Sequence, residues 1–419
     1  MGKLEKALGH KRFMIVKQFI KYIRDILYFV FHKRIQLITS DIELTVLGKK
    51  KKHVFFGYYD IQQLNTKEEK VLVHVVDKNA KTSINKAELG FYNINNKKYE
   101  KISETSAWNW QQGSRLRWWP TDDNYVCYND VIDNEYVCKK ININTKKVDS
   151  VFCKALYDID PQGTYGLSLN FSRLQRLRPG YGYDSIKDDT INISSPTKDG
   201  IYYVDLLKNE SQLIISLKKL AEKCYDKNAD QHYINHISIS PNGEKFIFFH
   251  IWTIKNSDKW KTCLYVSNKK GTELKILERD DLVSHYDWID SNNILITGYT
   301  KEKKQIYSIY NTITAKKTIL PSEYLNKDGH PTIINKQTEF ISDTYPKRMD
   351  LQELFHYDLL TNRKKTILYI YSSPLMYEEK RCDLHPRISR SERIITIDST
   401  FNDNCKKVIL IKKGEKYEK

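Results

Sequence analysis

The sequence predicts an all-β fold, a seven-bladed β-propeller with an N-terminal amphipathic helix. The chain of 419 residues contains 29 Tyr and 15 Phe but only 16 Gly and 10 Pro, and this composition favours strands over disorder or a helical bundle. From residue 53 onward, short apolar runs alternate with turn signals at a coarse period of about 40 to 60 residues, as in propeller blades. We therefore expect a helix and linker in residues 1–52 and the propeller in residues 53–419.

Residues 11–34 have the residue spacing of one amphipathic helix. Its apolar face would carry Phe13, Val16, Phe19, Ile20, Ile23, Ile26, Leu27 and Val30, and its polar face Lys17, Lys21, Arg24 and Asp25. Four charges in about twenty residues argue against a spanning helix, whereas a basic face opposite an apolar one suits peripheral contact with an anionic bilayer. The alternatives are packing on the domain and an oligomer contact. The run Lys49–Lys52 marks the boundary before the propeller.

Four histidines recur at one position of the repeat. Each begins a short strand that ends about five residues later at a turn. These pairs are His236 before Pro241-Asn242-Gly243, His285 before Asp290-Ser291-Asn292, His330 before Asn335-Lys336, and His385 before Arg390-Ser391. Counting back from the matching turns of the earlier blades gives Asp60, Arg115 and Leu156, which makes seven blade starts.

The first strand of each blade lines the central channel of a propeller, so the four histidines should converge at one end of the channel. The loops that follow the second strands open on the same face, and they carry Asn129, the segment 170–183, His250 and Arg348. A single histidine at a strand start is usually structural. Blade packing does not require an imidazole at the mouth of the channel, however. Four histidines at the same position of the repeat therefore predict a functional cluster.

The segment from Asn170 to Tyr183 is basic and aromatic, and we expect it to form a loop on that face. Its charged and aromatic members include Arg173, Arg176, Arg178, Tyr181 and Tyr183. Arginine suits bidentate recognition of a carboxylate, and tyrosine offers a flat surface for a sugar ring and a phenol that can pass a proton. At most two of the arginines should reach the site, and the alternative is a hydrophobic loop with solvated arginines. Tyr59, in a second aromatic segment, should line the rim.

Charge and cysteine usage limit the partners and the compartment. The formal charge of +17 would attract a polyanion, but the sequence has no nucleic-acid recognition motif, so we expect no nucleic acid partner. Seven scattered cysteines without a CxxC pair indicate neither a disulfide framework nor a zinc knuckle. No signal peptide is evident. We therefore expect a cytoplasmic protein, peripheral on the inner membrane if the helix binds lipid.

Three short motifs resemble the blade starts of propeller-type polysaccharide lyases, namely oligogalacturonate lyase and the related ulvan lyases. They are His236-Ile237-Ser238-Ile239-Ser240-Pro241-Asn242-Gly243, Gly329-His330-Pro331 and Arg381-Cys382-Asp383-Leu384-His385-Pro386-Arg387. The resemblance extends over most of the chain from about residue 53. It implies cleavage of an acidic, uronic-acid-containing polysaccharide or oligosaccharide by β-elimination, in which the carboxylate is neutralised, a base removes the neighbouring proton and an acid protonates the leaving oxygen.

The resemblance also implies residue roles. His236 matches the family's base or substrate-contacting histidine, and His285, His330 and His385 match the histidines that hold a divalent metal such as Mn, Ca or Zn. The family's site also uses a glutamine and a closely spaced second histidine in the sixth blade, and the sequence around His330 has neither. The alternative is therefore that no cofactor is required and that Arg178 or Arg348 neutralises the carboxylate.

The leading hypothesis is a lyase that edits a bacterial surface polysaccharide. Its predicted catalytic residues are His236, His285, His330, His385, Tyr183 and Arg178, with Tyr181 as the other candidate acid. Its predicted substrate-binding residues are Tyr59, Arg115, Arg173, Arg176, Tyr181, His250, Arg348 and Arg387. The alternative is a non-catalytic propeller that binds an acidic glycan or a partner protein through the same face.

Overall fold

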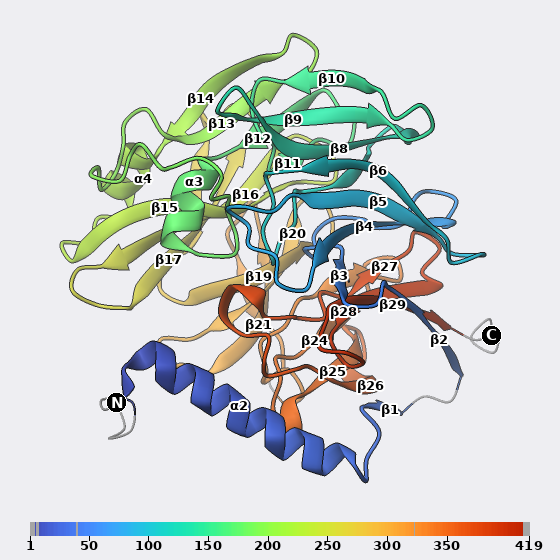
Figure 1. Ribbon diagram of the computed structural model, residues 1–419. Coiled ribbons are helices and arrows are strands. Elements are labelled where there is room, and N and C mark those ends of the chain that lie inside the picture. Colours follow the sequence, from blue (N-terminus) through green and yellow to red (C-terminus); the bar gives the residue numbers. More distant parts are fainter. Residues whose placement is uncertain (1–4, 6–7, 39–40, 322, 414–419) are drawn as a thin grey trace.

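The computed structural model describes the whole chain except residues 1–4, 6–7, 39–40, 322 and 414–419. Seven antiparallel sheets are arranged around a common centre, which confirms the predicted seven-bladed propeller (Figure 1). Within each sheet the strands follow chain order outward from the centre, except that β1 and β2 of the N-terminal segment form the outermost strands of two sheets. The start of the first strand therefore lies at the same end of the propeller as the end of the second strand.

The first four blades span residues 52–278. Blade one contains β3 (Lys52–Phe55), β4 (Lys70–Asp77), β5 (Ala87–Asn93) and β6 (Tyr99–Thr105). Blade two contains β7 (Arg117–Trp119), β8 (Asp122–Ile132), β9 (Glu135–Asn142) and β10 (Val148–Phe152). Blade three contains β11 (Asp158–Ile159), β12 (Tyr165–Ser168), β13 (Gly200–Asp205) and β14 (Glu210–Ser216). Blade four contains β15 (Ala229–Ile239), β16 (Lys245–Ile254), β17 (Trp260–Asn268) and β18 (Leu274–Glu278).

The last three blades complete the ring. Blade five contains β19 (Leu282–Trp288), β20 (Asn293–Tyr299), β21 (Gln305–Asn311) and β22 (Lys317–Ile319). Blade six contains β23 (Thr332–Ile334), β24 (Glu339–Asp343), β25 (Leu351–Asp358) and β26 (Arg363–Tyr371), and blade seven β27 (Arg387–Ile388), β28 (Ile394–Ser399) and β29 (Lys407–Lys413). The helices are α2 (His10–Phe29), α3 (Phe171–Leu177) and α4 (Leu217–Lys223), and short 3₁₀ turns are η1 (Arg348–Asp350) and η2 (Glu378–Lys380).

Two strands from the N-terminal segment belong to the propeller sheets. β2 (Ile42–Leu47) pairs with β29 and becomes the outer strand of blade seven, so the two ends of the chain close the ring. β1 (Ile35–Leu37) adds a fifth strand to blade six by pairing with β26. Ile35–Leu37 and Ile42–Leu47, which were expected to belong to the linker before residue 53, thus contribute strands to two blades.

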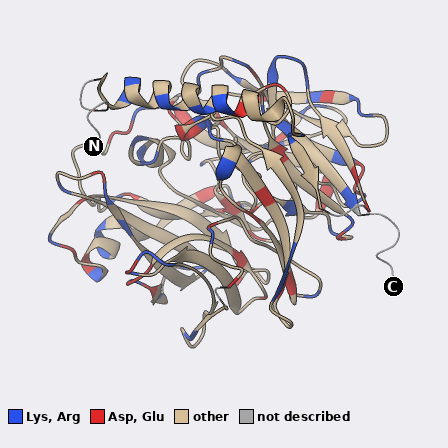
Figure 2. Cartoon of the chain, turned by 90° about the horizontal axis from the view of Figure 1, so that it is seen from below, with Lys and Arg blue, Asp and Glu red and all other residues tan. Residues whose placement is uncertain are grey.

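The helix expected over residues 11–34 is α2, which crosses the outside of the propeller beside blades six and seven (Figures 1 and 2). Figure 2 shows basic residues recurring along its length. Among the described residues, no helix is both long enough and apolar enough to cross a membrane. The core lies between neighbouring blades, where alternate strand residues from adjacent sheets interdigitate; the largest cluster extends across blades three to five.

Candidate functional site

The four blade-start histidines do converge at one end of the channel. The ring centroids of His285 and His330 lie 4.1 Å apart, those of His330 and His385 4.4 Å apart, and those of His236 and His285 6.1 Å apart. All four side chains are buried. We call these four residues the histidine cluster.

Unusual backbone conformations position two of these histidines. His236 and His385 adopt left-handed φ values of 55° and 45°, and Arg115 of blade two has a φ of 54°. Non-glycine residues rarely adopt this conformation, which costs about 1–3 kcal/mol and is commonly retained at functional sites. His236 also lies where the pairing of β15 with β16 shifts register. Such a bulge redirects a side chain.

A segment of blade one fills the middle of the cluster. The inner strand of this blade pairs with β4 at Phe55 and again at Leu64, opposite His74 and Val71, so eight residues lie across from two. This excursion carries Tyr58 and Tyr59 into the channel. The ring of Tyr58 lies 4.8 to 6.4 Å from all four histidine rings, and that of Tyr59 lies 5.2 to 6.3 Å from three of them.

Hydrogen bonds to Nδ1 orient the histidines. His330 Nδ1 donates to Asp343 at 2.8 Å, and His385 Nδ1 donates to the carbonyl oxygen of Gly57 at 2.8 Å. His285 Nδ1 lies 3.4 Å from Asp328 and 3.1 Å from the hydroxyl of Ser284. Because a carbonyl oxygen only accepts, Nε2 of His385 keeps its lone pair in the neutral ring. The Nε2 atoms of His330 and His385 and the Nδ1 atom of His236 are buried without a hydrogen-bond partner among the described residues.

The four imidazoles differ in protonation. Burial lowers the pKa of His236 and His385 well below the ordinary value and also lowers the pKa of His285, and neighbouring positive charge adds to the effect. Burial opposes the charged form of His330 too, but the carboxylates of Asp343, Asp383 and Asp328 together outweigh it and raise the pKa of His330. The cluster therefore contains neutral imidazoles beside one that favours the charged form.

Three residues of this region could hold a cation. One ligand atom from each of His330, Asp383 and His385 lies within 4.8 Å of the others. The two unpartnered Nε2 atoms and the carboxylate match the donor preference of divalent transition metals, and the Nδ1 hydrogen bonds fix the imidazole tautomers. Arg381 already binds Asp383 through contacts of 2.7 to 2.9 Å. This group includes two of the three histidines expected as metal ligands, together with Asp383.

A small pocket opens beside His236. It has a volume of about 50 Å³, and its lining includes Arg178, Tyr181, His236, His285 and Tyr345. The Arg178 guanidinium lies over the rings of Tyr181 and Trp260 at 5.4 and 5.3 Å. The Tyr181 ring lies 6.1 Å from both Tyr58 and His236. The structure thus brings Arg178 and Tyr181 of the expected basic loop to the histidine cluster.

Other members of that loop have structural partners instead. Residues 171–177 form the helix α3, not an open loop, and Asn170 caps it by accepting from the Arg173 amide. The buried Arg173 guanidinium donates to the carbonyls of Thr190, Ile193, Ser194 and His232 and to the side chains of Thr190 and Gln231. These hydrogen bonds anchor the segment 190–194 and give Arg173 structural partners in place of the open position expected for it.

Tyr183 and Arg176 are also held away from the cluster. The Tyr183 hydroxyl accepts from Asn129 at 2.9 Å and its ring stacks on Phe171, and burial raises the pKa of Tyr183. Tyr183 is therefore not placed as an acid for a group at His236. Arg176 pairs with Asp188 at 2.7 Å.

Four further predicted binding residues have other surroundings. Arg115 is buried and pairs with Asp60 through contacts of 3.1 and 3.0 Å, and Arg387 is buried and pairs with Asp398 at 2.9 Å. His250 is buried, with Nε2 2.9 Å from His232 Nδ1. Arg348 is exposed in η1, beside α2. These positions give the first three a structural role and leave Arg348 outside the cluster.

Sequence reasoning missed several residues at the cluster. Tyr58 adjoins Tyr59 in an aromatic segment that was singled out, but its central position depends on the excursion in blade one. Tyr345 lies 5.7 Å from His330, and Arg381 lies over its ring at 4.9 Å. Asp343 ends the second strand of blade six, and nothing in the neighbouring sequence predicts its contact with His330.

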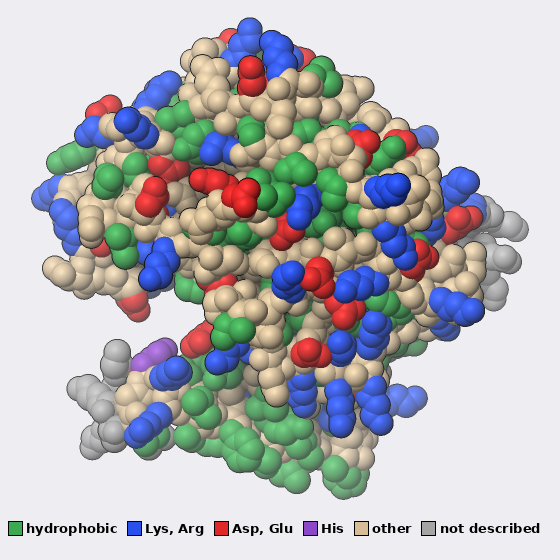
Figure 3. All heavy atoms as spheres, turned by 45° about the horizontal axis from the view of Figure 1, so that its top comes forward, with side chains coloured by type: hydrophobic (Ala, Val, Ile, Leu, Met, Phe, Trp, Pro, Cys, Tyr) green, Lys and Arg blue, Asp and Glu red, His purple; other side chains and the backbone are tan. Residues whose placement is uncertain are grey.

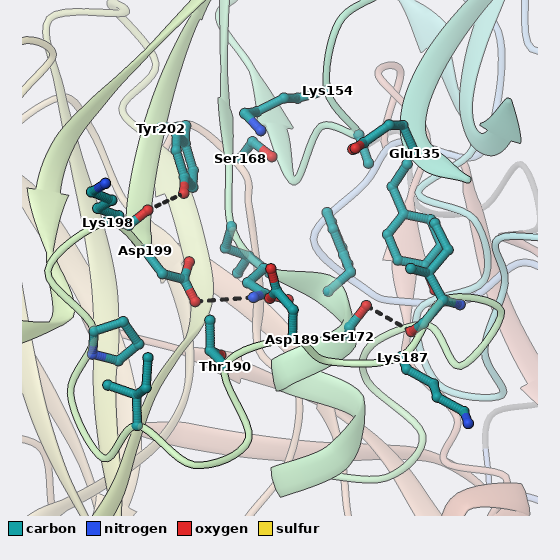
Figure 4. A pocket seen from close by; sticks show the side chains of 18 of the residues that line it. Glu135, Lys154, Ser168, Ser172, Lys187, Asp189, Thr190, Lys198, Asp199 and Tyr202 are labelled. Carbon is teal, nitrogen blue, oxygen red and sulfur yellow. Dashed lines mark hydrogen bonds between the residues drawn. The ribbon is translucent and has the colours of Figure 1, made fainter. Parts of the chain in front are cut away.

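A larger pocket lies between blades two and three, away from the histidines (Figure 4). Its volume is about 570 Å³, and Glu135, Lys154, Asp189, Lys198 and Asp199 contribute to its lining. Burial raises the pKa of Asp199, one oxygen of which accepts from Asn170 while the other has no partner among the described residues. None of the predicted site residues lines this pocket.

The fold and the site together define a seven-bladed β-propeller with a histidine-lined channel end. No family model and no curated protein matches the chain. Among solved structures, an oligogalacturonate lyase in complex with manganese is similar at a TM-score of 0.66 and 14% identity, covering 92% of this chain and 96% of its own. The oligogalacturonate lyase of Vibrio parahaemolyticus is similar at a TM-score of 0.65 and 12% identity, covering 91% and 96%.

The tricorn protease is also similar, at a TM-score of 0.51 and 9% identity, covering 85% of this chain and 34% of its own. All three identities are low, and the similar structures differ in activity. The comparisons therefore establish the propeller fold, and they include oligogalacturonate lyases among its structural neighbours.

Proposed function

We propose that this protein is a lyase that cleaves an acidic, uronic-acid-containing glycan by β-elimination at the histidine cluster. The observation that carries the proposal is the convergence of four histidines from blades four to seven, with Tyr181 and Arg178 beside His236. The structural similarity to oligogalacturonate lyases supports the same reaction class.

His236 is the proposed base. Its imidazole is neutral because burial lowers its pKa, and Nδ1 is free of partners among the described residues. Nδ1 can accept the C5 proton of a uronate. As that proton leaves, the C4–C5 double bond forms and the bond from C4 to the glycosidic oxygen breaks.

Arg178 and Tyr181 provide the other two roles. The guanidinium can pair with the uronate carboxylate, which makes the C5 proton more acidic, and the Tyr181 hydroxyl can protonate the departing oxygen. Both side chains line the same pocket as His236. A divalent cation held by His330, Asp383 and His385 would supply Lewis-acid stabilisation of the carboxylate charge.

Substrate entry requires local movement. Ligand pockets usually measure about 300–1,000 Å³, whereas the pocket beside His236 measures about 50 Å³. Arg178 and Tyr181 both line this pocket, so displacement of their side chains is the simplest way to admit a sugar ring.

The test is to incubate the purified protein with a panel of uronic-acid-containing bacterial glycans and to follow the ultraviolet absorbance of the unsaturated uronate. Parallel reactions contain a chelator or added manganese. We expect absorbance to rise and the new chain ends to be lighter by one water than hydrolysis products. Products that contain the added water would contradict a lyase. Glycan binding without products would instead favour a binding propeller.

A further inference from the structure

The helix α2 packs on the propeller with its polar side inward. Lys21 Nζ and Arg24 Nη2 each lie 2.5 Å from a carboxylate oxygen of Asp350 in η1. Asp25 is completely buried and accepts from Arg24. An amphipathic helix of a globular protein normally buries its apolar stripe. α2 does the opposite.

The apolar side of α2 consequently faces outward. Its exposed members are Ile15, Val16, Phe19, Ile20, Ile23, Ile26, Leu27, Val30 and the following Phe31. Phe19 is 56% exposed, Leu27 66% and Phe31 86%. Exposed Leu37 and Ile38, at and after β1, extend the same patch. Figure 3 shows a band of apolar side chains along the lower edge of the molecule.

The exposed charges within residues 10–38, the segment that carries this patch, have one sign. From residue 10 to residue 38, Asp25 is the only acidic residue in the sequence, and it is buried. The exposed basic residues are Lys11, Arg12, Lys17 and Lys33. A second copy docked through this patch would bring like charges together, whereas an anionic lipid surface would offer apolar chains and opposite charge.

We propose that the exposed face of α2, together with Leu37 and Ile38, is a docking surface for an anionic membrane. The helix lies in the membrane interface with its apolar side chains among the acyl chains. Lys11, Arg12 and Lys17 contact the headgroups. The pairs of Lys21 and Arg24 with Asp350 transmit this attachment to the propeller.

The docking surface lies at the histidine end of the propeller. Asp350 follows the second strand of blade six, and Asn404, which donates to Tyr22, follows the second strand of blade seven. Tyr371, whose ring contacts Phe29 at 4.9 Å, ends the fourth strand of blade six. In antiparallel blades these positions share the end at which the first strands begin. Membrane attachment would therefore hold the histidine cluster close to the bilayer surface.

Vesicle flotation with the full-length protein tests this inference. The vesicles contain phosphatidylcholine alone or phosphatidylcholine with phosphatidylglycerol. We expect the wild-type protein to float with the anionic vesicles and a Phe19→Asp/Leu27→Asp variant to stay at the bottom. The matched control is Leu207→Asp/Leu360→Asp, which changes two exposed leucines in turns at the opposite end of the propeller and should float like wild type.

Three single substitutions separate the contribution of charge from that of apolar contact. Lys11→Gln, Arg12→Gln and Lys17→Gln should each weaken binding to anionic vesicles about fivefold. Wild-type protein that does not bind anionic vesicles, or that binds neutral vesicles equally well, would overturn the proposal. Equal flotation of the Phe19→Asp/Leu27→Asp variant would also overturn it. The proposal would also be overturned if no vesicle binding occurs and light scattering shows a wild-type dimer that is lost in the Phe19→Asp/Leu27→Asp variant. Circular dichroism confirms that each variant is folded.

Discussion

Asp343 connects the starts of blades six and seven to the histidine cluster. Its buried carboxylate accepts from the His330 amide at 2.8 Å and from His330 Nδ1 at 2.8 Å. It also accepts from the amides of Leu384 and His385 at 3.1 and 3.2 Å. One side chain thus holds two of the four histidines in place.

Asp343→Asn should destabilise the protein by about 3–5 kcal/mol. The substitution turns one carboxylate oxygen into an NH₂ group that donates. If this group takes the place of Oδ2, it faces the backbone amides of Leu384 and His385, which also donate. Two buried N–H groups without an acceptor cost about 1–3 kcal/mol each, and removal of one partner of a buried ion pair costs about 3–5 kcal/mol. The measurement is urea unfolding at equilibrium, followed by tryptophan fluorescence.

The control is Glu104→Gln, which alters an exposed pair with Lys86 at 2.8 Å. Surface pairs of this kind contribute little, so its unfolding midpoint should match wild type. An Asp343→Asn protein with the wild-type midpoint would refute the idea that this carboxylate holds the two blade starts together.

Three further outcomes follow from buried groups. Arg173→Met should lower the free energy of unfolding by about 3–5 kcal/mol, because carbonyls of the segment 190–194 lose their donor; a change confined to substrate affinity would contradict this structural role. Burial raises the pKa of Asp25 in the folded protein to about 6. Protonation of Asp25 therefore stabilises the folded state fully at a pH below the pKa of the unfolded state, and this stabilisation is lost as the pH rises through about 6. Asp25→Asn should therefore stabilise the protein above pH 6 by about 1–3 kcal/mol, with no gain near pH 4, and equal unfolding midpoints at both pH values would contradict this. Tyr58→Ala should cost about 3–5 kcal/mol through the cavity it leaves, whereas Tyr58→Phe should be near neutral because the Tyr58 hydroxyl has no partner among the described residues; equal losses in thermal unfolding would contradict this.

The repeat phase of the sequence was sufficient to predict the fold class and the convergence of the four histidines. A residue that recurs at one position of a blade must point to one place, whatever the local packing. The same reasoning placed Arg178 and Tyr181 on the correct face. Local spacing could therefore predict those parts of the site that follow from the repeat.

The remaining features depend on contacts between distant segments. The pairing of β2 with β29 joins residues at the two ends of the chain, and nothing local to the run Ile42–Leu47 predicts it. Arg173 and Arg178 are alike in sequence, but α3 turns the first toward buried carbonyls and leaves the second at the pocket. Asp343 and Asp383 became recognisable only when their histidine neighbours were located.

The most direct test of the account compares two buried histidines in the elimination assay. His236→Gln removes the proposed base, whereas His250→Gln alters a histidine that is paired with His232 outside the cluster. We predict that the His236→Gln protein, shown to be folded, forms no unsaturated uronate while the His250→Gln protein keeps most of the wild-type rate. Equal activity of the two variants, or loss only in His250→Gln, would contradict the assignment of the histidine cluster as the catalytic site.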